Sequence, residues 1–198
     1  ETRINAQISI VVPLASLLTE DEASAQGGQI NGSPVGADVI RERILNEAWS
    51  DERQAFAESF GGRDLDASAL LMAEVGFIDP NDARFVATVD ALEKSLCDGP
   101  YMRRYEAPDD FGKPETAFNI CTFWRIDALA RIGRKEQARE HFESLLAARN
   151  PLGLLSEDTH PQTHELWGNF PQTYSQVGLI LSAMRLSRSW EEGLWHAS

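Results

Sequence analysis

Hydrophobic residues recur with the period of an α-helix along most of the chain from residue 37 onward. In residues 80–96, Phe85, Val89, Leu92 and Leu96 are spaced four, three and four apart, which places them on one helix face. Patterns of this kind predict helices over residues 37–49, 66–75, 80–96, 115–133, 135–149 and 171–188. Strand patterns are limited to residues 55–60 and 101–105, which predict short hairpin pieces between helices. The predicted fold class is all-α.

Two consecutive helices differ in how many of their sides are apolar. Residues 115–133 carry apolar side chains around nearly the whole circumference, which is typical of a helix enclosed on several sides. Residues 135–149 are apolar on one side only, and Gly133 is the expected C-cap between the two helices. An enclosed helix followed by a one-sided helix is what concentric inner and outer helices would produce.

Other helix ends carry recognisable signals. Asp66 is a plausible N-cap, and Pro80 is expected to open a helix with Asn81 and Asp82 near its start.

The first 36 residues have a different character. Residues 8–18 are apolar but too few to span a bilayer, and acidic residues follow them where a signal peptide should be neutral. This favours a short element packed on its neighbour over a secretory signal. Residues 25–36 are rich in Gly, Ser and Asn and predict a linker. We therefore expect a separate segment over residues 1–36, a helical unit over residues 37–188 and a tail over residues 189–198.

Charge and cysteine content narrow the classes of partner and compartment. The chain has 31 acidic and 18 basic residues, a net charge of −13, which disfavours binding to nucleic acid or to an anionic membrane. Cys97 and Cys121 can form neither a disulfide framework nor a metal motif, and they are expected to be buried free thiols. Free thiols are typical of a reducing compartment, so we expect the protein to be cytoplasmic.

Two long polar segments are the candidates for chemistry. Residues 99–115 and 153–172 each precede an apolar helix, so a barrel of helices would bring them to the same end. Carboxylates, arginines and aromatic rings suit the binding of a sugar and the activation of water. The side chains expected to converge there are Glu115, Glu157, Asp158, Arg103, Arg104, Tyr105, Trp167 and Phe170.

Ordinary structural roles compete with each of these assignments. A single loop glutamate such as Glu157 is usually only solvated, and Arg103 and Arg104 could simply pair with Asp109 and Asp110. Trp124 and Trp167 are core residues by default. A zinc site at His160 and His164 is disfavoured because Pro161 interrupts any helix that would present both side chains.

Three segments, residues 65–84, 115–158 and 168–180, resemble the C-terminal half of the catalytic domain of glycoside hydrolase family 15, which contains glucoamylases and α,α-trehalases. The resemblance runs from about residue 37 to residue 188 and implies a partial (α/α)6 barrel, roughly its last six helices. It also implies inverting hydrolysis of an α-glucoside such as trehalose, maltose or a starch end, with two carboxylates and no metal or other cofactor.

The resemblance also implies roles for individual residues. Glu157 closes a Gly-Leu-Leu-Ser-Glu segment at the position of the general base, and Arg104 and Tyr105 match a motif that contacts substrate hydroxyls. Glu115 is expected to line the pocket, and Trp167 is a further candidate for substrate binding.

The family's general acid lies in a Trp-Glu motif upstream of the matched segments, and no such motif occurs before Trp190. We therefore expect this chain alone to be inactive, and to associate with other copies through the exposed seam of a half barrel. The alternative function is a non-catalytic helical remnant, or a carbohydrate-binding or assembly module.

Overall fold

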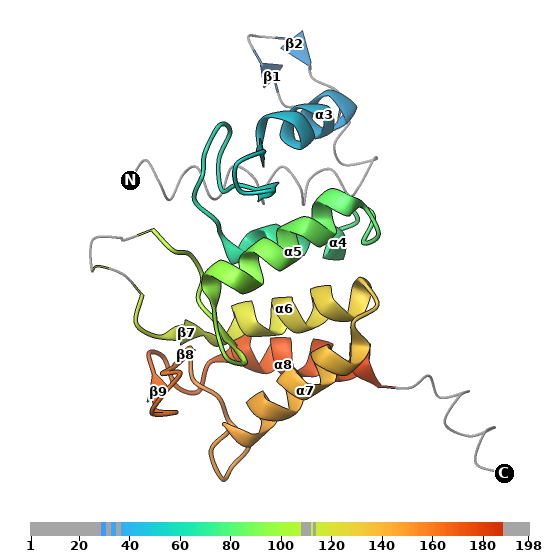
Figure 1. Ribbon diagram of the computed structural model, residues 1–198. Helices are drawn as coiled ribbons and strands as arrows, with labels where there is room; N and C mark the ends of the chain where they lie inside the picture. Colours follow the sequence, from blue (N-terminus) through green and yellow to red (C-terminus); the bar gives the residue numbers. More distant parts are fainter. Residues whose placement is uncertain (1–28, 31–32, 35–36, 108–111, 113, 188–198) are drawn as a thin grey trace, which may run out of the picture.

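A computed structural model of the chain describes residues 29–30, 33–34, 37–107, 112 and 114–187 (Figure 1). The apolar run at residues 8–18 and the tail at residues 189–198 lie outside the described residues. Helices are the main element of the described part of the chain, as predicted, and they hold about half of its residues. The described α-helices are α3 (Ala37–Glu47), α4 (Leu71–Glu74), α5 (Ala83–Leu96), α6 (Asn119–Arg131), α7 (Lys135–Ala147) and α8 (Thr173–Leu186), and a 3-10 helix η1 (Ala67–Leu70) precedes α4.

Local chemistry at the helix ends explains where the boundaries fall. Asp66 caps η1, as predicted, by accepting a hydrogen bond from the backbone N–H of Ser68 at 2.7 Å. The helix expected from Pro80 begins instead at Ala83, because the Asp82 side chain caps its first turn. At the end of α6, Gly133 adopts a φ of +88°, so the predicted glycine C-cap is confirmed.

Small antiparallel pairs of strands lie between the helices. In sequence order, β1 (Gln29–Ile30) pairs with β2 (Ser33–Pro34), β3 (Trp49–Ser50) with β4 (Ala55–Phe56), and β5 (Cys97–Asp98) with β6 (Tyr101–Met102). A three-stranded sheet joins β7 (Ala117–Phe118), β8 (Asp158–Thr159) and β9 (Leu166–Trp167). The hairpin pieces predicted at residues 55–60 and 101–105 are present as β4 and β6.

This three-stranded sheet corrects the prediction for α6. The helix expected to start at Glu115 starts at Asn119, because Ala117 and Phe118 pair in register with Thr159 and Asp158 of β8. The sheet thereby attaches the long segment after α7 to the N-terminal end of α6.

Helix α6 lies at the centre of the core, as its apolar circumference predicts. It packs against α7 and α8 and also contacts η1 and α4 (Figure 1). Ten of its side chains are buried, including Phe123, Ile126 and Leu129. In contrast, α7 buries only Ala138 and Leu145, which agrees with the predicted one-sided helix.

The buried Arg125 of α6 fixes the turn that opens the first polar segment, residues 99–115. Its guanidinium donates to the Glu93 carboxylate at 2.8 Å and to the carbonyls of Gly99 and Pro100 at 3.2 and 3.3 Å. The same guanidinium contacts Nε2 of His141 at 2.7 Å. Burial and the nearby Arg125 charge lower the pKa of His141, which favours the neutral ring.

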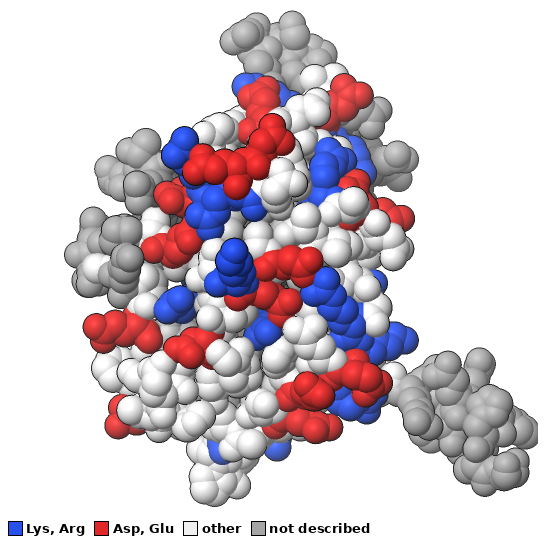
Figure 2. All heavy atoms as spheres, viewed as in Figure 1, with Lys and Arg blue, Asp and Glu red and all other residues white. Residues whose placement is uncertain are grey.

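Acidic and basic side chains are interspersed over the face that carries α5, α6 and α7 (Figure 2). Arg134, for example, pairs with Asp90 at 2.6 Å and with Glu93 at 3.5 Å. Among the described helices, none combines the length and the apolar character that crossing a bilayer would require.

Candidate functional site

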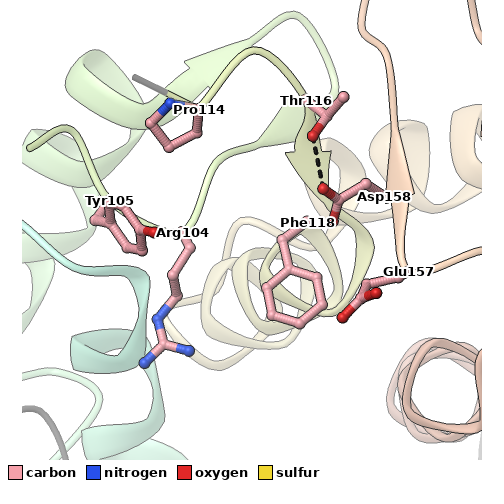
Figure 3. A pocket seen from close by; sticks show the side chains of 7 residues that line it. All are labelled: Arg104, Tyr105, Pro114, Thr116, Phe118, Glu157 and Asp158. Atoms are coloured by element: carbon pink, nitrogen blue, oxygen red, sulfur yellow. Dashed lines mark hydrogen bonds between the residues drawn. The ribbon is translucent and has the colours of Figure 1, made fainter. Parts of the chain in front are cut away.

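A cavity of about 290 Å³ lies beside the N-terminal end of α6. Both long polar segments contribute to it, as predicted, because β7 and β8 hold them side by side. Figure 3 shows its lining residues, which are Arg104, Tyr105, Pro114, Thr116, Phe118, Glu157 and Asp158. The Glu157 carboxylate and the Arg104 guanidinium lie on opposite sides of the Phe118 ring (Figure 3).

The backbone of Glu157 is held from two directions. Its N–H donates to the carbonyl of Asn169 at 2.9 Å, and its carbonyl accepts from the N–H of Asn119 at 3.0 Å. The buried Asn119 side chain also donates to the carbonyl of Ser156 at 3.0 Å and accepts from the Thr159 hydroxyl at 2.9 Å. The first residue of α6 therefore holds both the candidate base and the strand β8 that directly follows it.

The side chain of Glu157 is bonded on one oxygen only. Oε2 accepts from the backbone N–H of Asn169 at 3.1 Å and from its Nδ2 at 3.0 Å. Within the described part of the chain, no residue donates to Oε1. A carboxylate oxygen without a protein donor beside a cavity is able to accept a proton from a bound water.

Arg104 is oriented by a buried partner. Its Nε donates to both oxygens of Asp66, at 2.9 and 3.0 Å, and its guanidinium carbon lies 5.6 Å from the Trp124 ring centroid. Burial opposes the charge of Arg104, but the neighbouring Asp66 carboxylate outweighs it, so the pKa of Arg104 lies above its ordinary value. Because these two bonds come from Nε, the Nη atoms are the donors of this guanidinium that suit hydroxyl groups of a ligand.

A second carboxyl group, that of Asp158, lines the same cavity. Burial raises its pKa, and so does the charge of Glu157, while the hydrogen bond from the Thr116 hydroxyl at 2.6 Å acts in the opposite direction. The adjacent carboxyl groups therefore differ in their partners, because Asp158 binds the Thr116 hydroxyl whereas Glu157 binds Asn169.

The cavity brings together only part of the expected set. Glu157, Asp158, Arg104 and Tyr105 line it, whereas the other expected residues do not. Glu115 is exposed between two lining residues. Trp167, on β9, is 49% exposed, and its ring is tilted by 43° to that of His160, with centroids 6.4 Å apart.

Two further members of the expected set also lie outside the cavity lining. Phe170 is 49% exposed, and Arg103 donates to the Ser95 carbonyl.

The partners of Arg104 and Glu157 were not anticipated from the sequence. Asp66 pairs with Arg104, while the suggested partners Asp109 and Asp110 lie outside the described residues. Asn169 binds Glu157 across eleven intervening residues, because the antiparallel pair β8 and β9 between them brings the two residues together. Over the described residues, no three His, Cys, Asp or Glu side chains are grouped as metal ligands would be.

Comparison with solved structures shows that the fold is similar to part of the fold of known glycosidases. A wild-type glycosidase superposes with a TM-score of 0.65 at 22% identity, covering 76% of this chain and 43% of the glycosidase. A variant glycosidase in complex with glucose gives a TM-score of 0.64 at 20% identity over the same shares.

Comparison of sequences identifies the family. A trehalase from Thermoplasma volcanium is 35% identical over 153 residues, which are 77% of this chain and 25% of that protein. A trehalase from Mycobacterium tuberculosis is 36% identical over 159 residues, which are 79% of this chain and 23% of that protein. The chain thus spans about a quarter of the length of these relatives. The profile of the glycosyl hydrolases family 15 matches residues 6–184, a range that begins before the resemblance noted from residue 37, and the chain belongs to this family.

Proposed function

We propose that this chain carries the general-base side of an inverting α-glucosidase site, with Glu157 as the base and α,α-trehalose as the first substrate to test. The observation that carries the proposal is the Glu157 carboxylate, bound through Oε2 and without a described donor on Oε1, in the same cavity as Arg104. The relatives named trehalases support this choice of substrate.

In the proposed reaction, the oxygen of a water molecule attacks the anomeric carbon of the glucosyl unit. As the new C–O bond forms, Glu157 takes a proton from this water and the bond to the leaving oxygen breaks. The Nη atoms of Arg104 donate hydrogen bonds to sugar hydroxyls and so hold the ring against Phe118. The leaving oxygen needs a proton from a general acid, for which residues 37–188 contain no Trp-Glu motif.

A substrate whose leaving group needs little protonation separates the role of the base from that of the acid. The purified chain should release fluoride from α-glucosyl fluoride and form β-glucose first, while its hydrolysis of trehalose should be negligible. Glu157→Gln should lower fluoride release by about a hundredfold or more, in the range usual for loss of a general base. A fluoride electrode and proton NMR of the product anomer measure both quantities.

Glu165→Gln is the matched control, because Glu165 lies in the same segment but does not line the cavity. Glu157 is rejected as the base if fluoride release falls equally in Glu157→Gln and Glu165→Gln, or if it is unchanged in Glu157→Gln. Binding of glucose by calorimetry without any fluoride release would favour a non-catalytic carbohydrate-binding module instead.

A further inference from the structure

Every hydrogen bond that the Glu157 side chain makes within the described residues comes from one neighbouring residue. The backbone N–H and the side-chain Nδ2 of Asn169 both donate to Oε2, at 3.1 and 3.0 Å. The backbone of Glu157 is joined to the same residue, because its N–H donates to the Asn169 carbonyl at 2.9 Å. Three hydrogen bonds therefore link Glu157 to Asn169.

The preceding residue, Gly168, leaves room for the carboxylate. Its φ is +75°, a conformation that favours glycine, and a Cβ at this position would lie 2.8 Å from Oε2 of Glu157 and 3.0 Å from its Cβ. Any larger residue would thus meet the side chain of Glu157 in its present rotamer. Gly168 is needed for two independent reasons, the backbone conformation and the close approach of Glu157.

The effect of this arrangement is to distinguish the two oxygens of one carboxylate. Oε2 is committed to Asn169, while Oε1 has no donor among the described residues and Glu157 lines the cavity. Without the two donors, rotation about the terminal torsion of the glutamate would exchange its oxygens freely, because that torsion is broad. A base that must meet one water in one position gains from such a restraint.

We infer that Gly168 and Asn169 are positioning residues for Glu157, which hold Oε2 and leave Oε1 to receive the proton of the attacking water. This inference rests on the proposed role of Glu157 as the base. A displacement of about 1 Å at a reacting group costs on the order of a hundredfold in rate, so loss of the restraint should lower turnover more than binding.

The kinetic test compares fluoride release from α-glucosyl fluoride by the 198-residue chain. Asn169→Ala and Gly168→Ala are expected to lower kcat by about tenfold to a hundredfold, with KM changed by less than about threefold. Gly133→Ala is the matched control, because Gly133 has a similar φ of +88° but a Cβ placed there would have no atom within 4 Å. If kcat falls as much in Gly133→Ala as in Gly168→Ala, backbone strain alone explains the decrease and the inference is wrong.

A second measurement is independent of hydrolysis. In ¹⁵N-labelled protein, the backbone and side-chain amide signals of Asn169 should shift as Glu157 is protonated on lowering the pH. The shifts should disappear in Glu157→Gln and Gly168→Ala and persist in Gly133→Ala. Asn169 signals that titrate equally in Glu157→Gln would overturn the inference.

The two measurements also separate the two proposals. If the amide signals follow Glu157 but no variant of Glu157 affects fluoride release, the positioning contact exists and the proposed function fails. If Glu157→Gln abolishes release while Asn169→Ala and Gly168→Ala behave like Gly133→Ala, the proposed function stands and the positioning role fails.

Discussion

Asp66 and Asp82 both cap a helix and bind an arginine, but only Asp66 is fully buried. Comparing variants of the two tests how much the buried pair of Asp66 and Arg104 contributes to the stability of the fold. Asp66 and Asp82 each cap a helix by accepting from the backbone N–H two residues ahead, at 2.7 and 2.8 Å. Each also binds an arginine, Arg104 or Arg84, at 2.9 and 3.1 Å. The Asp66 side chain is 3% exposed and that of Asp82 is 29% exposed.

The expected costs follow from these exposures. Loss of either helix cap should lower the free energy of unfolding by about 1 kcal/mol. The Asp82 pair is open to water and adds about 1 kcal/mol at most, so Asp82→Ala should cost about 1–2 kcal/mol. Removing Asp66 leaves Arg104, only 26% exposed, without its partner, which adds about 3 kcal/mol and brings the cost of Asp66→Ala to about 4 kcal/mol.

Urea unfolding followed by circular dichroism measures the free energy of unfolding of each variant. Asp66→Asn should retain most of the cap, because asparagine is an equally good N-cap, and should lose the charge contribution of about 3 kcal/mol. In the double variant Asp66→Ala/Arg104→Met no unpaired charge remains, so it should be more stable than Asp66→Ala alone. Equal costs for Asp66→Ala and Asp82→Ala would refute the claim that burial of the Arg104 pair matters.

Three further outcomes are expected. Gly178→Ala should lower the free energy of unfolding by about 2 kcal/mol, because its Cβ would lie 2.7 Å from the Phe123 ring, and urea unfolding measures this. Because burial raises the pKa of Asp158 in the folded chain, the ionised carboxyl group destabilises the fold as the pH rises past the ordinary range of an aspartate, so the stability of Asp158→Asn relative to the wild type should increase as the pH is raised through and above that range. Ile180 and Leu181 are 54% and 55% exposed on α8, so the chain should self-associate in light scattering, and Leu181→Lys should reduce this; a monomer that binds no hydrophobic dye would contradict it.

Hydrophobic periodicity predicted the helices well because it reports which side of each helix is enclosed. The circumference of α6 and the single face of α7 are both properties of a local pattern, and the structure confirms them. The starts of α5 and α6 were misplaced for different reasons. Asp82 caps α5 through a side chain, whereas β7 forms only because a segment about forty residues later supplies its partner.

Residue type and spacing could not have found the partners that define the site. Arg104 and Asp66 are 38 positions apart, and nothing local to either indicates the pair. The resemblance to a family indicated Glu157 and Arg104, and the structure places both in one cavity with Tyr105.

The predicted roles of Glu115 and Trp167 in substrate binding remain predictions. Pro114, Thr116 and Phe118 line the cavity, whereas Glu115, between the first two, is exposed and does not line it.

The enclosed character of α6 and the position of the candidate base are connected through Asn119. A helix surrounded by packing has little freedom to shift, so its first residue is a rigid point from which a neighbouring strand can be held. Asn119 uses that position for its backbone N–H and both ends of its amide, binding Glu157, Ser156 and Thr159. A polar residue buried this deeply is stable only when each of its groups is hydrogen-bonded, and here they are. The apolar core and the polar cavity thus depend on each other, because the helix at the centre of the core also holds Glu157 and the strand β8 that follows it.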